Sequence, residues 1–513
     1  MKKKLGLLMF ALTVVLSACG GGNEPKGTDA GTPSASPSSA PPAEASVDEL
    51  PPVELIHYIP DYNTNAAMPE VNEAVNEYLK EKINATVKMI RVDWGSYTQK
   101  MNVILASNDP VDLFTTFSVT DLTPIGLVNK GALLDSTELF EKYAPQSLSY
   151  FTPTLLDTAK INGRLYAMPN YLMWAQEAGF THNIELATRN NIDFSNVKKF
   201  EDMEPILRTI KANEPGVIPL VLSDLGFLNP LGGASDPSLN IWDINKFTGV
   251  KMDDSSMTVV SAFETPEFLE RAKVVRKWYQ DGLINSDAVT TKDVNALKPK
   301  AFTDYGAVHA DMGLELMDSI WKPWGTAVKA IAVTPTFSPY NAAQTSMTAI
   351  AANSKNPERA AMYLELLHSD PEFSNLFLYG VEGKHYNKVD GKYREAIDGV
   401  DYNLPDWVVC NCQLKLLAPG QAADTLEQEK MANDKAITAD FAGFSFNPEP
   451  VKTEIANATA ALNEFLPGIT TGSLDPEKYI PQLVAKLKSA GLEKIITETQ
   501  TQLDTWAKAV GKK

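Results

Sequence analysis

Short apolar strands alternate with amphipathic segments along residues 53–128, and this alternation constrains the fold more than any other feature of the chain. Val71, Val75 and Leu79 follow the spacing of one helix face, and Pro60 is expected to end the strand before them. The pattern predicts a parallel sheet covered by helices, with ligands bound beyond the carboxyl ends of the strands. The expected strands are 53–59, 86–92 and 111–117, and the expected helices are 71–79, 97–105 and one that begins at 124.

A second block of the same kind follows, and the chain of 513 residues is longer than one core usually serves. Thr265 followed by Pro266 has the form of a helix start, with threonine as the N-cap. The second block and the length of the chain together predict at least two lobes. The predicted strands are 178–182, 217–222 and 257–260, and the predicted helices are 200–212, 266–280, 356–368 and most of the tail from 476.

The amino terminus has the pattern of an export signal. Three lysines at positions 2–4 precede an apolar run, 5–16, that is too short for an ordinary membrane-spanning helix. Small residues then lead to Cys19, which resembles the acylated cysteine of a bacterial lipobox. We expect a lipoprotein signal peptide at 1–18 and a lipid (palmitate) on Cys19, at the extracytoplasmic face of the cell membrane. The alternative is an ordinary secretory signal with an incidental cysteine.

A linker is predicted after the lipidated cysteine. Residues 19–52 are rich in proline, serine and glycine and contain no aromatic residue. Such a segment cannot bury enough apolar surface to offset its ordering entropy, so we expect it to be disordered. It would act as a spacer between a membrane and the folded part of the chain.

The charge and the motif content exclude several classes of function. The formal net charge of −18 disfavours nucleic acid and anionic lipid as partners. No serine-nucleophile elbow, zinc-protease helix or phosphate-binding loop is present in the sequence, so the chain is predicted to be no enzyme and to need no cofactor or metal. Cys410 and Cys412 are interpreted as packed thiols rather than as a reactive or metal-binding pair.

Several stretches, taken in order, resemble bacterial extracellular solute-binding lipoproteins of ABC importers, family 1, in the LipO-like branch. Residues 106–114 resemble the family's ASGDxPDLF motif, and residues 162–169 resemble NGKxYAxP. Residues 443–448 and the tail helices resemble a C-terminal domain of uncharacterised function. The other matching stretches are 276–284 (xKWYxxGLI), 353–360 (xxSKNPEKA) and 379–386 (YGxEGxHY).

The resemblance implies an α/β chain with the two-lobed, periplasmic-binding-protein-like fold of type II. Crossing segments would form a hinge between the lobes, and extra helices would follow at the carboxyl end. The expected boundaries are 53–172 and 300–344 for the amino lobe, 173–299 and 345–440 for the carboxyl lobe, and 441–513 for the helical extension.

The function implied by the resemblance is capture of a small polar ligand, expected to be an oligosaccharide, between the lobes of a tethered monomer. Delivery to the transmembrane subunits of an ABC permease would follow. Two alternatives from other classes stay open, namely a secreted carbohydrate-active hydrolase and a surface adhesin or sensor that uses the same clamp.

The candidate ligand-binding residues are aromatic and polar side chains at the expected edges of the cleft. Aromatic rings stack on the C–H faces of sugars, while carboxylates bind sugar hydroxyls. The competing interpretation for each ring is packing in a core. The aromatic candidates are Tyr58, Trp94, Phe117, Trp174, Phe227, Trp321, Trp324 and Tyr340. The others are Asp61, Thr116, Asp121, and Asp311 with Met312 in a stretch that resembles a cleft-facing loop of the family.

Overall fold

The computed structural model describes residues 50–62, 67–107, 109–118, 120, 122–231, 236–309, 322–400 and 402–513. The predicted signal peptide and most of the predicted linker lie outside these residues. Among the residues that the structure describes, no helix has the length and apolar character needed to cross a membrane.

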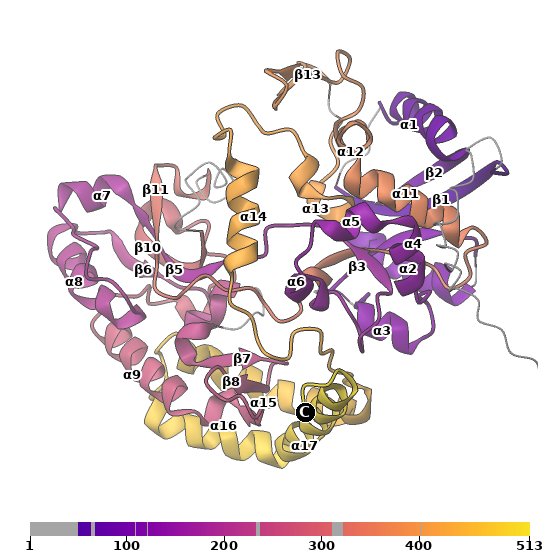
Figure 1. Cartoon of the computed structure of the whole chain (residues 1–513). Helices are drawn as coiled ribbons and strands as arrows, with labels where there is room; N and C mark the ends of the chain where they lie inside the picture. The colour runs from indigo at the N-terminus through magenta and orange to yellow at the C-terminus, as the bar shows by residue number, and fades with distance from the viewer. Residues whose placement is uncertain are drawn as a thin grey trace, which may run out of the picture. The chain divides into compact units, whose positions relative to one another are not determined.

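The amino lobe is built on a five-stranded sheet with the order β2-β1-β3-β12-β4. Figure 1 labels β1, β2 and β3 of this sheet. The first three strands are parallel, as predicted, and β12 runs antiparallel between β3 and β4. Contrary to expectation, β1 continues past Pro60, which lies beyond the β3 ladder at His57 and Tyr58, where a missing N–H is tolerated. The strands are β1 (Val53–Asp61), β2 (Ala85–Asp93), β3 (Leu113–Phe117), β4 (Ala167–Pro169) and β12 (Ser346–Ile350).

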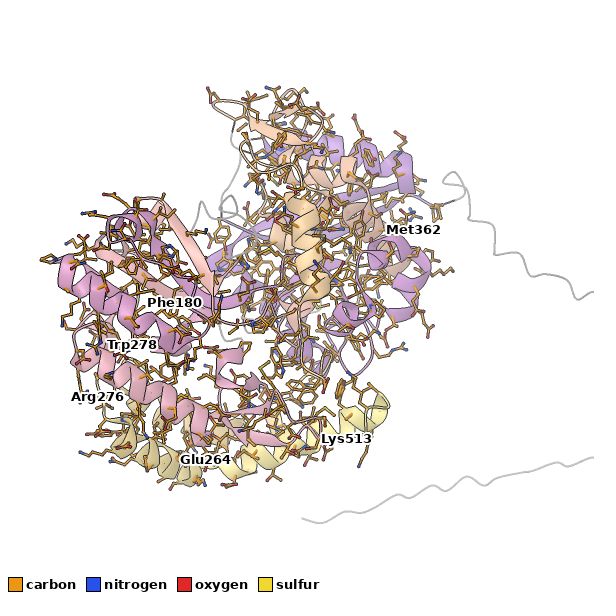
Figure 2. All side chains as sticks on the ribbon, turned by 60° about the vertical axis from the view of Figure 1, so that its left-hand side comes forward. Phe180, Glu264, Arg276, Trp278, Met362 and Lys513 are labelled. Carbon is orange, nitrogen blue, oxygen red and sulfur yellow. The ribbon has the colours of Figure 1, made fainter. Side chains whose placement is uncertain are left out.

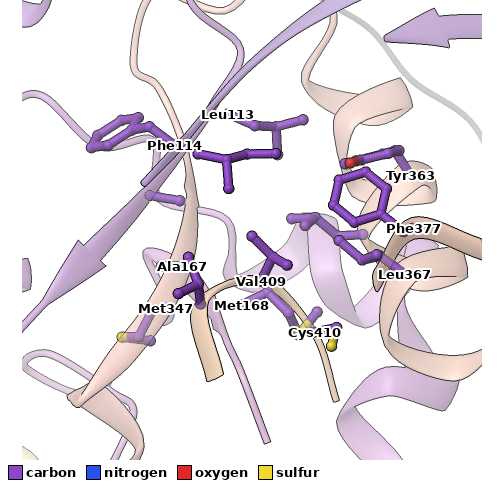
Figure 3. Close-up of a cluster of buried hydrophobic side chains, with 14 of the residues drawn as sticks. Leu113, Phe114, Ala167, Met168, Met347, Tyr363, Leu367, Phe377, Val409 and Cys410 are labelled. Carbon is purple, nitrogen blue, oxygen red and sulfur yellow. The ribbon is translucent and has the colours of Figure 1, made fainter. Parts of the chain in front are cut away.

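The core of the amino lobe combines segments that lie far apart in the sequence. Figure 3 shows Leu113 of β3 on the side of Tyr363, Leu367 and Phe377 from two later helices, whereas Phe114 of β3 and Met347 of β12 point to the other side. Cys410 lies in the same core, and burial raises the pKa of its thiol far above the usual value, so the predicted packing role holds for this unpaired cysteine. The helices are α1 (Met68–Ile83), α2 (Trp94–Ser107), α3 (Pro124–Asn129), α4 (Thr137–Tyr143), α5 (Pro145–Ser149), α6 (Pro153–Asp157), α11 (Pro357–Ser369), α12 (Pro371–Tyr379) and α13 (Asp406–Val409).

The carboxyl lobe has a four-stranded sheet of order β11-β5-β10-β6 and a smaller sheet of order β7-β8-β9. Trp278, labelled in Figure 2, is fully buried on α9. Its ring is stacked on that of Phe200, with ring centroids 4.9 Å apart. The Thr265 hydroxyl accepts a hydrogen bond from Phe268 N, as its predicted N-cap role requires. The elements are β5 (Glu177–Asn183), β6 (Ile218–Val221), β7 (Ile241–Asp243), β8 (Thr248–Lys251), β9 (Val259–Ser261), β10 (Ala301–Val308), β11 (Val328–Ala332), α7 (Ile184–Arg189), α8 (Glu204–Asn213) and α9 (Pro266–Gln280).

The structure places two later segments in the opposite lobes from those predicted. Residues 300–344 were expected in the amino lobe, but β10 and β11 both pair with β5 of the carboxyl lobe. Residues 345–440 were expected in the carboxyl lobe, but β12, α11 and α12 complete the amino lobe. The local sequence identifies a strand from its own composition, whereas the lobe that it joins depends on a pairing partner far away in the chain.

The last part of the chain is helical, as predicted from the tail. One face of α17 is buried, including the predicted Leu492, Ile495, Thr499, Leu503 and Trp506. A hairpin of β13 (Tyr386–Val389) and β14 (Tyr393–Ala396) precedes these helices, which are α14 (Thr425–Lys435), α15 (Lys452–Thr470), α16 (Pro476–Ala490) and α17 (Leu492–Ala509).

Two buried histidines in the amino lobe make the stability of the fold depend on pH. His57 Nδ1 lies 3.1 Å from Tyr363 Oη, and His368 is buried at the end of α11. Burial lowers the pKa of both side chains to about 3, and for His57 the neighbouring His368 lowers it further. Both therefore stay neutral in the folded chain at a pH where they would protonate in the unfolded chain.

We expect the free energy of unfolding to fall as the pH drops below about 6.5, by up to about 1.4 kcal/mol per pH unit for each histidine. Urea unfolding of the wild type between pH 7 and pH 5 measures this slope. In the variant His368→Gln the side chain at 368 cannot be protonated in the unfolded chain, so the free energy of unfolding should depend less on pH than in the wild type. A stability that does not change with pH in this window would contradict the prediction.

Candidate functional site

Four aromatic side chains gather where β1, β2 and β3 end, and we call this group the aromatic platform: Tyr62, Trp94, Phe117 and Trp407. The Trp94 ring is at its centre. Its centroid lies 5.6 Å from that of Tyr62, 5.0 Å from that of Phe117 and 5.3 Å from that of Trp407. Tyr62 is 53% exposed, Trp94 and Trp407 are half-buried, and Phe117 is buried. Three rings thus keep accessible surface above a buried fourth.

The parallel strand register brings the platform together. Asp61 and Asp93 end β1 and β2 as direct partners, so the residues that follow them, Tyr62 and Trp94, lie side by side. Phe117 ends β3, the neighbour of β1 on its other side. The carboxyl ends of adjacent parallel strands are where ligands bind in α/β sheets, and both Trp94 and Phe117 were predicted from this rule.

Trp407 was not predicted, because it reaches the platform from a short helix almost three hundred residues later. The backbone of α13 is anchored next to it: Val408 O accepts hydrogen bonds from Thr115 Oγ1 at 3.3 Å and from Asn170 Nδ2 at 2.7 Å. These bonds tie α13 to β3 and to the residue after β4. The only local signal was a tryptophan in a proline-containing loop, which does not indicate where the loop lies.

A buried ion pair supports the platform from below. Asp61 Oδ2 lies 2.5 Å from Arg91 Nε, and the two side chains are 3% and 8% exposed. The other carboxylate oxygen accepts a hydrogen bond of 2.7 Å from Tyr62 N. Asp61, predicted as a ligand contact, is therefore engaged in holding the backbone of Tyr62, and its carboxylate offers little surface to a sugar hydroxyl.

The remaining candidates of the amino lobe are not part of the platform. Tyr58 is half-buried in β1, with Lys100 Nζ 5.9 Å from its ring centroid. Thr116 is buried in β3, and its hydroxyl has no hydrogen-bond partner among the residues that the structure describes. Asp121, Asp311, Met312, Trp321 and Cys19 lie outside the described residues.

The other predicted aromatic residues serve as packing in this structure. Phe227 is fully buried in the carboxyl-lobe core, 5.5 Å from the ring of Phe268, and so presents no surface to a ligand. Trp324 is 1% exposed, in a cluster with Val221, Ala301 and Val328. Trp174 is 6% exposed and packs on Tyr171, while the Tyr340 hydroxyl donates to Ile244 O at 3.1 Å. An aromatic residue near a segment boundary has the same appearance in the sequence whether it packs or binds.

In the part of the chain that the structure describes, three segments cross between the lobes, and the middle one pairs with each of the other two. Gln176, Phe337 and Ile437 each lie on one crossing, and Phe337 bridges the other two. Phe337 N donates to Gln176 O at 2.8 Å, and Ile437 N donates to Thr336 O at 3.1 Å. This three-stranded hinge confirms that the lobes are joined by crossing segments.

Helix α14 leads into the last crossing, and its Asn433 side chain forms hydrogen bonds to the backbone of the first crossing. The Asn433 Oδ1 atom accepts hydrogen bonds from Trp174 N and Ala175 N, both of 2.9 Å, and its Nδ2 donates to Leu172 O at 2.7 Å. Asn433 is buried, so these three bonds are shielded from water. Among the described residues, no three histidine, cysteine or acidic side chains are grouped so that they could hold a metal ion.

Two family models match the sequence. Residues 63–371 match the model described as bacterial extracellular solute-binding protein. Residues 440–508, which include α15, α16 and most of α17, match a domain of unknown function. Together these matches cover most of the described chain.

The chain is similar to solute-binding proteins of known sequence and structure. It is 29% identical over 517 residues to a carbohydrate ABC transporter substrate-binding protein of Streptococcus pneumoniae, covering 98% of this chain and 97% of that protein. The crystal structure of an N-glycan transport solute binding protein from the same species has a TM-score of 0.77 and 28% identity, over 89% of this chain and 99% of that chain. That protein in complex with Man5GlcNAc has a TM-score of 0.63 and 28% identity over the same shares, 89% and 99%. These similarities confirm the predicted α/β fold class.

Proposed function

Because the chain belongs to the family of bacterial extracellular solute-binding proteins, we propose that it captures an oligosaccharide and delivers it to the permease of an ABC importer. The aromatic platform carries this proposal. The platform lies at the carboxyl ends of β1, β2 and β3. Its fourth ring, Trp407, comes from a segment that follows the first two crossings. The family is described as solute-binding, which supports the proposal that the chain binds its ligand without changing it.

The platform suits a sugar ring for chemical reasons. Pyranose rings have apolar C–H faces that pack on aromatic rings, and their hydroxyls point to the sides, where polar groups can bind them. Trp94 and Trp407 are inclined by 69° to each other, so their exposed faces form two walls rather than one plane. An oligosaccharide with more than one ring can contact both walls.

The proposed ligand is a glycan that contains mannose and N-acetylglucosamine. The solute binding protein from Streptococcus pneumoniae, 28% identical to this chain, was crystallised with Man5GlcNAc. The match between the two proteins covers 89% of this chain and 99% of that chain. The platform residues are neutral, which fits a neutral glycan better than an acidic one.

We also propose that the chain is tethered by a lipid on Cys19 and acts as a monomer at the outer face of the cell membrane. The family is described as extracellular, which supports the extracytoplasmic location. Each buried CH₂ of an acyl chain contributes about 0.8 kcal/mol to membrane binding. Mass spectrometry of the purified chain would show the acyl group on the peptide that begins with Cys19.

Calorimetric titration of the full chain with Man5GlcNAc tests the proposed ligand. We expect saturable binding of one glycan per chain, and at a glycan concentration of 100 Kd the folded state gains about 2.7 kcal/mol. A glycan-dependent rise of the melting temperature checks the same result independently.

Chromatography of the glycan after incubation separates this function from a hydrolase, since the glycan should be recovered unchanged. A shortened glycan would contradict the proposal in favour of an enzyme. Failure to bind any oligosaccharide of a broad neutral panel would also contradict it.

A further inference from the structure

The C-terminal extension, residues 440–513, is attached first of all to the carboxyl lobe. Leu462, Phe465 and Leu483 of α15 and α16 belong to the same buried cluster as Trp278. The Arg276 guanidinium of α9 donates to Gly472 O at 2.8 Å and to Ser473 O at 2.9 Å (Figure 2 labels Arg276). The first two helices of the extension are therefore part of the carboxyl-lobe core.

The extension also reaches the hinge. One buried cluster, here called the hinge cluster, joins side chains of β7, the middle crossing and the extension. Phe337, the residue that bridges the other two crossings, is fully buried in it. Its ring centroid lies 6.0 Å from that of Trp242, and the Phe444 centroid lies 5.9 Å from that of Trp506. The largest side chains of the hinge cluster are Trp242, Phe337, Phe441, Phe444 and Trp506, and Leu503 also belongs to it.

The loop that leads into the extension, residues 440–447, is tied to α17. Asn447 N donates to Gln502 Oε1 at 2.8 Å, and Gln502 Nε2 donates back to Asn447 O at 2.9 Å. Near the other end of the loop, Lys512 Nζ donates to Asp440 O at 2.6 Å. The loop and the last helix therefore form one connected unit.

The same loop touches the amino lobe and the end of the middle crossing. Gln344 Nε2 donates to Ser445 Oγ at 3.2 Å and also to Thr158 O at 3.1 Å, just beyond α6. Gly443 has a φ of +90°, and a Cβ atom there would lie 2.6 Å from Asp157 O. Only glycine allows the loop to approach the amino lobe this closely.

We infer that the domain of unknown function is a brace for the hinge. Its first two helices are fixed in the carboxyl lobe, its last helix packs in the same buried cluster as Phe337, and its loop contacts Gln344 and approaches Asp157 of the amino lobe. Motion of one lobe against the other bends the crossing segments, and packed side chains around a bending segment resist that motion. The brace limits opening of the hinge hydrogen bonds, whichever ligand the lobes bind, so this role goes beyond the proposed function.

Hydrogen–deuterium exchange of the full chain, read by mass spectrometry, tests the brace. In Trp506→Ala we expect peptides that contain the amides of Phe337, Ser338 and Ile437 to exchange about tenfold faster. Peptides of β1 in the amino-lobe core should keep their rates. Unchanged exchange at the hinge amides in Trp506→Ala would overturn the inference.

Leu462→Ala is the matched control, because Leu462 is buried in the same extension but belongs to the carboxyl-lobe cluster. It should leave the hinge amides unchanged, and an equal acceleration would show that the effect is general loosening. If Trp506→Ala does not fold, Gln502→Ala removes the two hydrogen bonds to Asn447 from a half-buried position. This variant should accelerate hinge exchange about threefold, and no acceleration would equally overturn the inference.

Discussion

Replacing Trp94 and Trp407 together by alanine is expected to weaken Man5GlcNAc binding by about 100-fold, which corresponds to about 2.7 kcal/mol. Aromatic side chains that a ligand covers are typical hot spots, with each truncation weakening binding at least tenfold. Both tryptophans are half-buried at the rim of the sheet, so their loss removes ligand contact without emptying the core. Calorimetric titration measures the affinity, and circular dichroism checks that the double variant is folded.

The control for the platform uses a tryptophan that is buried instead of accessible. Trp324→Phe keeps an aromatic ring in a cluster where Trp324 is 1% exposed, and glycan affinity should stay within about twofold of the wild type. Trp94→Phe removes half of an accessible indole and should weaken binding several-fold. Equal effects of the two variants, or an unchanged affinity in the double alanine variant, would show that the ligand binds elsewhere.

The part of the site that could be predicted is the part determined by local sequence and sheet topology. Trp94 and Phe117 directly follow or end apolar strands, and parallel strands present such positions at one edge. The strands and helices of residues 53–128 followed from hydrophobic spacing in the same way, since Val71, Val75 and Leu79 repeat at helical spacing and are buried on one face of α1. Strands such as β10 and β12 were not predicted.

The part that could not be predicted depends on contacts between distant segments. Trp407 joins the platform only because Val408 is bonded to Thr115 and Asn170, and no property of the local sequence encodes that pairing. The lobe of β10 or β12 is set in the same way, by a partner strand. Phe227 and Trp324 are aromatic, as expected of residues that contact a sugar, yet both are buried. Aromatic side chains bury a large apolar surface, so packing in a core is as common a role for them as ligand binding.

The Asp61–Arg91 pair below the platform gives the largest expected change in stability. In Asp61→Ala the free energy of unfolding should fall by about 3–5 kcal/mol, because the Arg91 charge would stay buried without its partner. Arg91 is held in place by a hydrogen bond to Asn403 O and by the ring of Tyr402, so it cannot easily turn to solvent. Urea unfolding at neutral pH measures the loss.

A double-variant cycle separates loss of the pair from loss of a charge. Arg91→Met removes the other charge and leaves Asp61 unpaired, so this single variant should also be strongly destabilised. The variant with both changes buries no unpaired charge and should lose less stability than either single variant, so the coupling energy should be at least about 3 kcal/mol. It should nevertheless bind glycan more weakly than the wild type, because the Asp61 carboxylate also accepts the hydrogen bond from Tyr62 N. Additive losses in the cycle would show that Asp61 supports the platform through that backbone bond alone and that the ion pair contributes little.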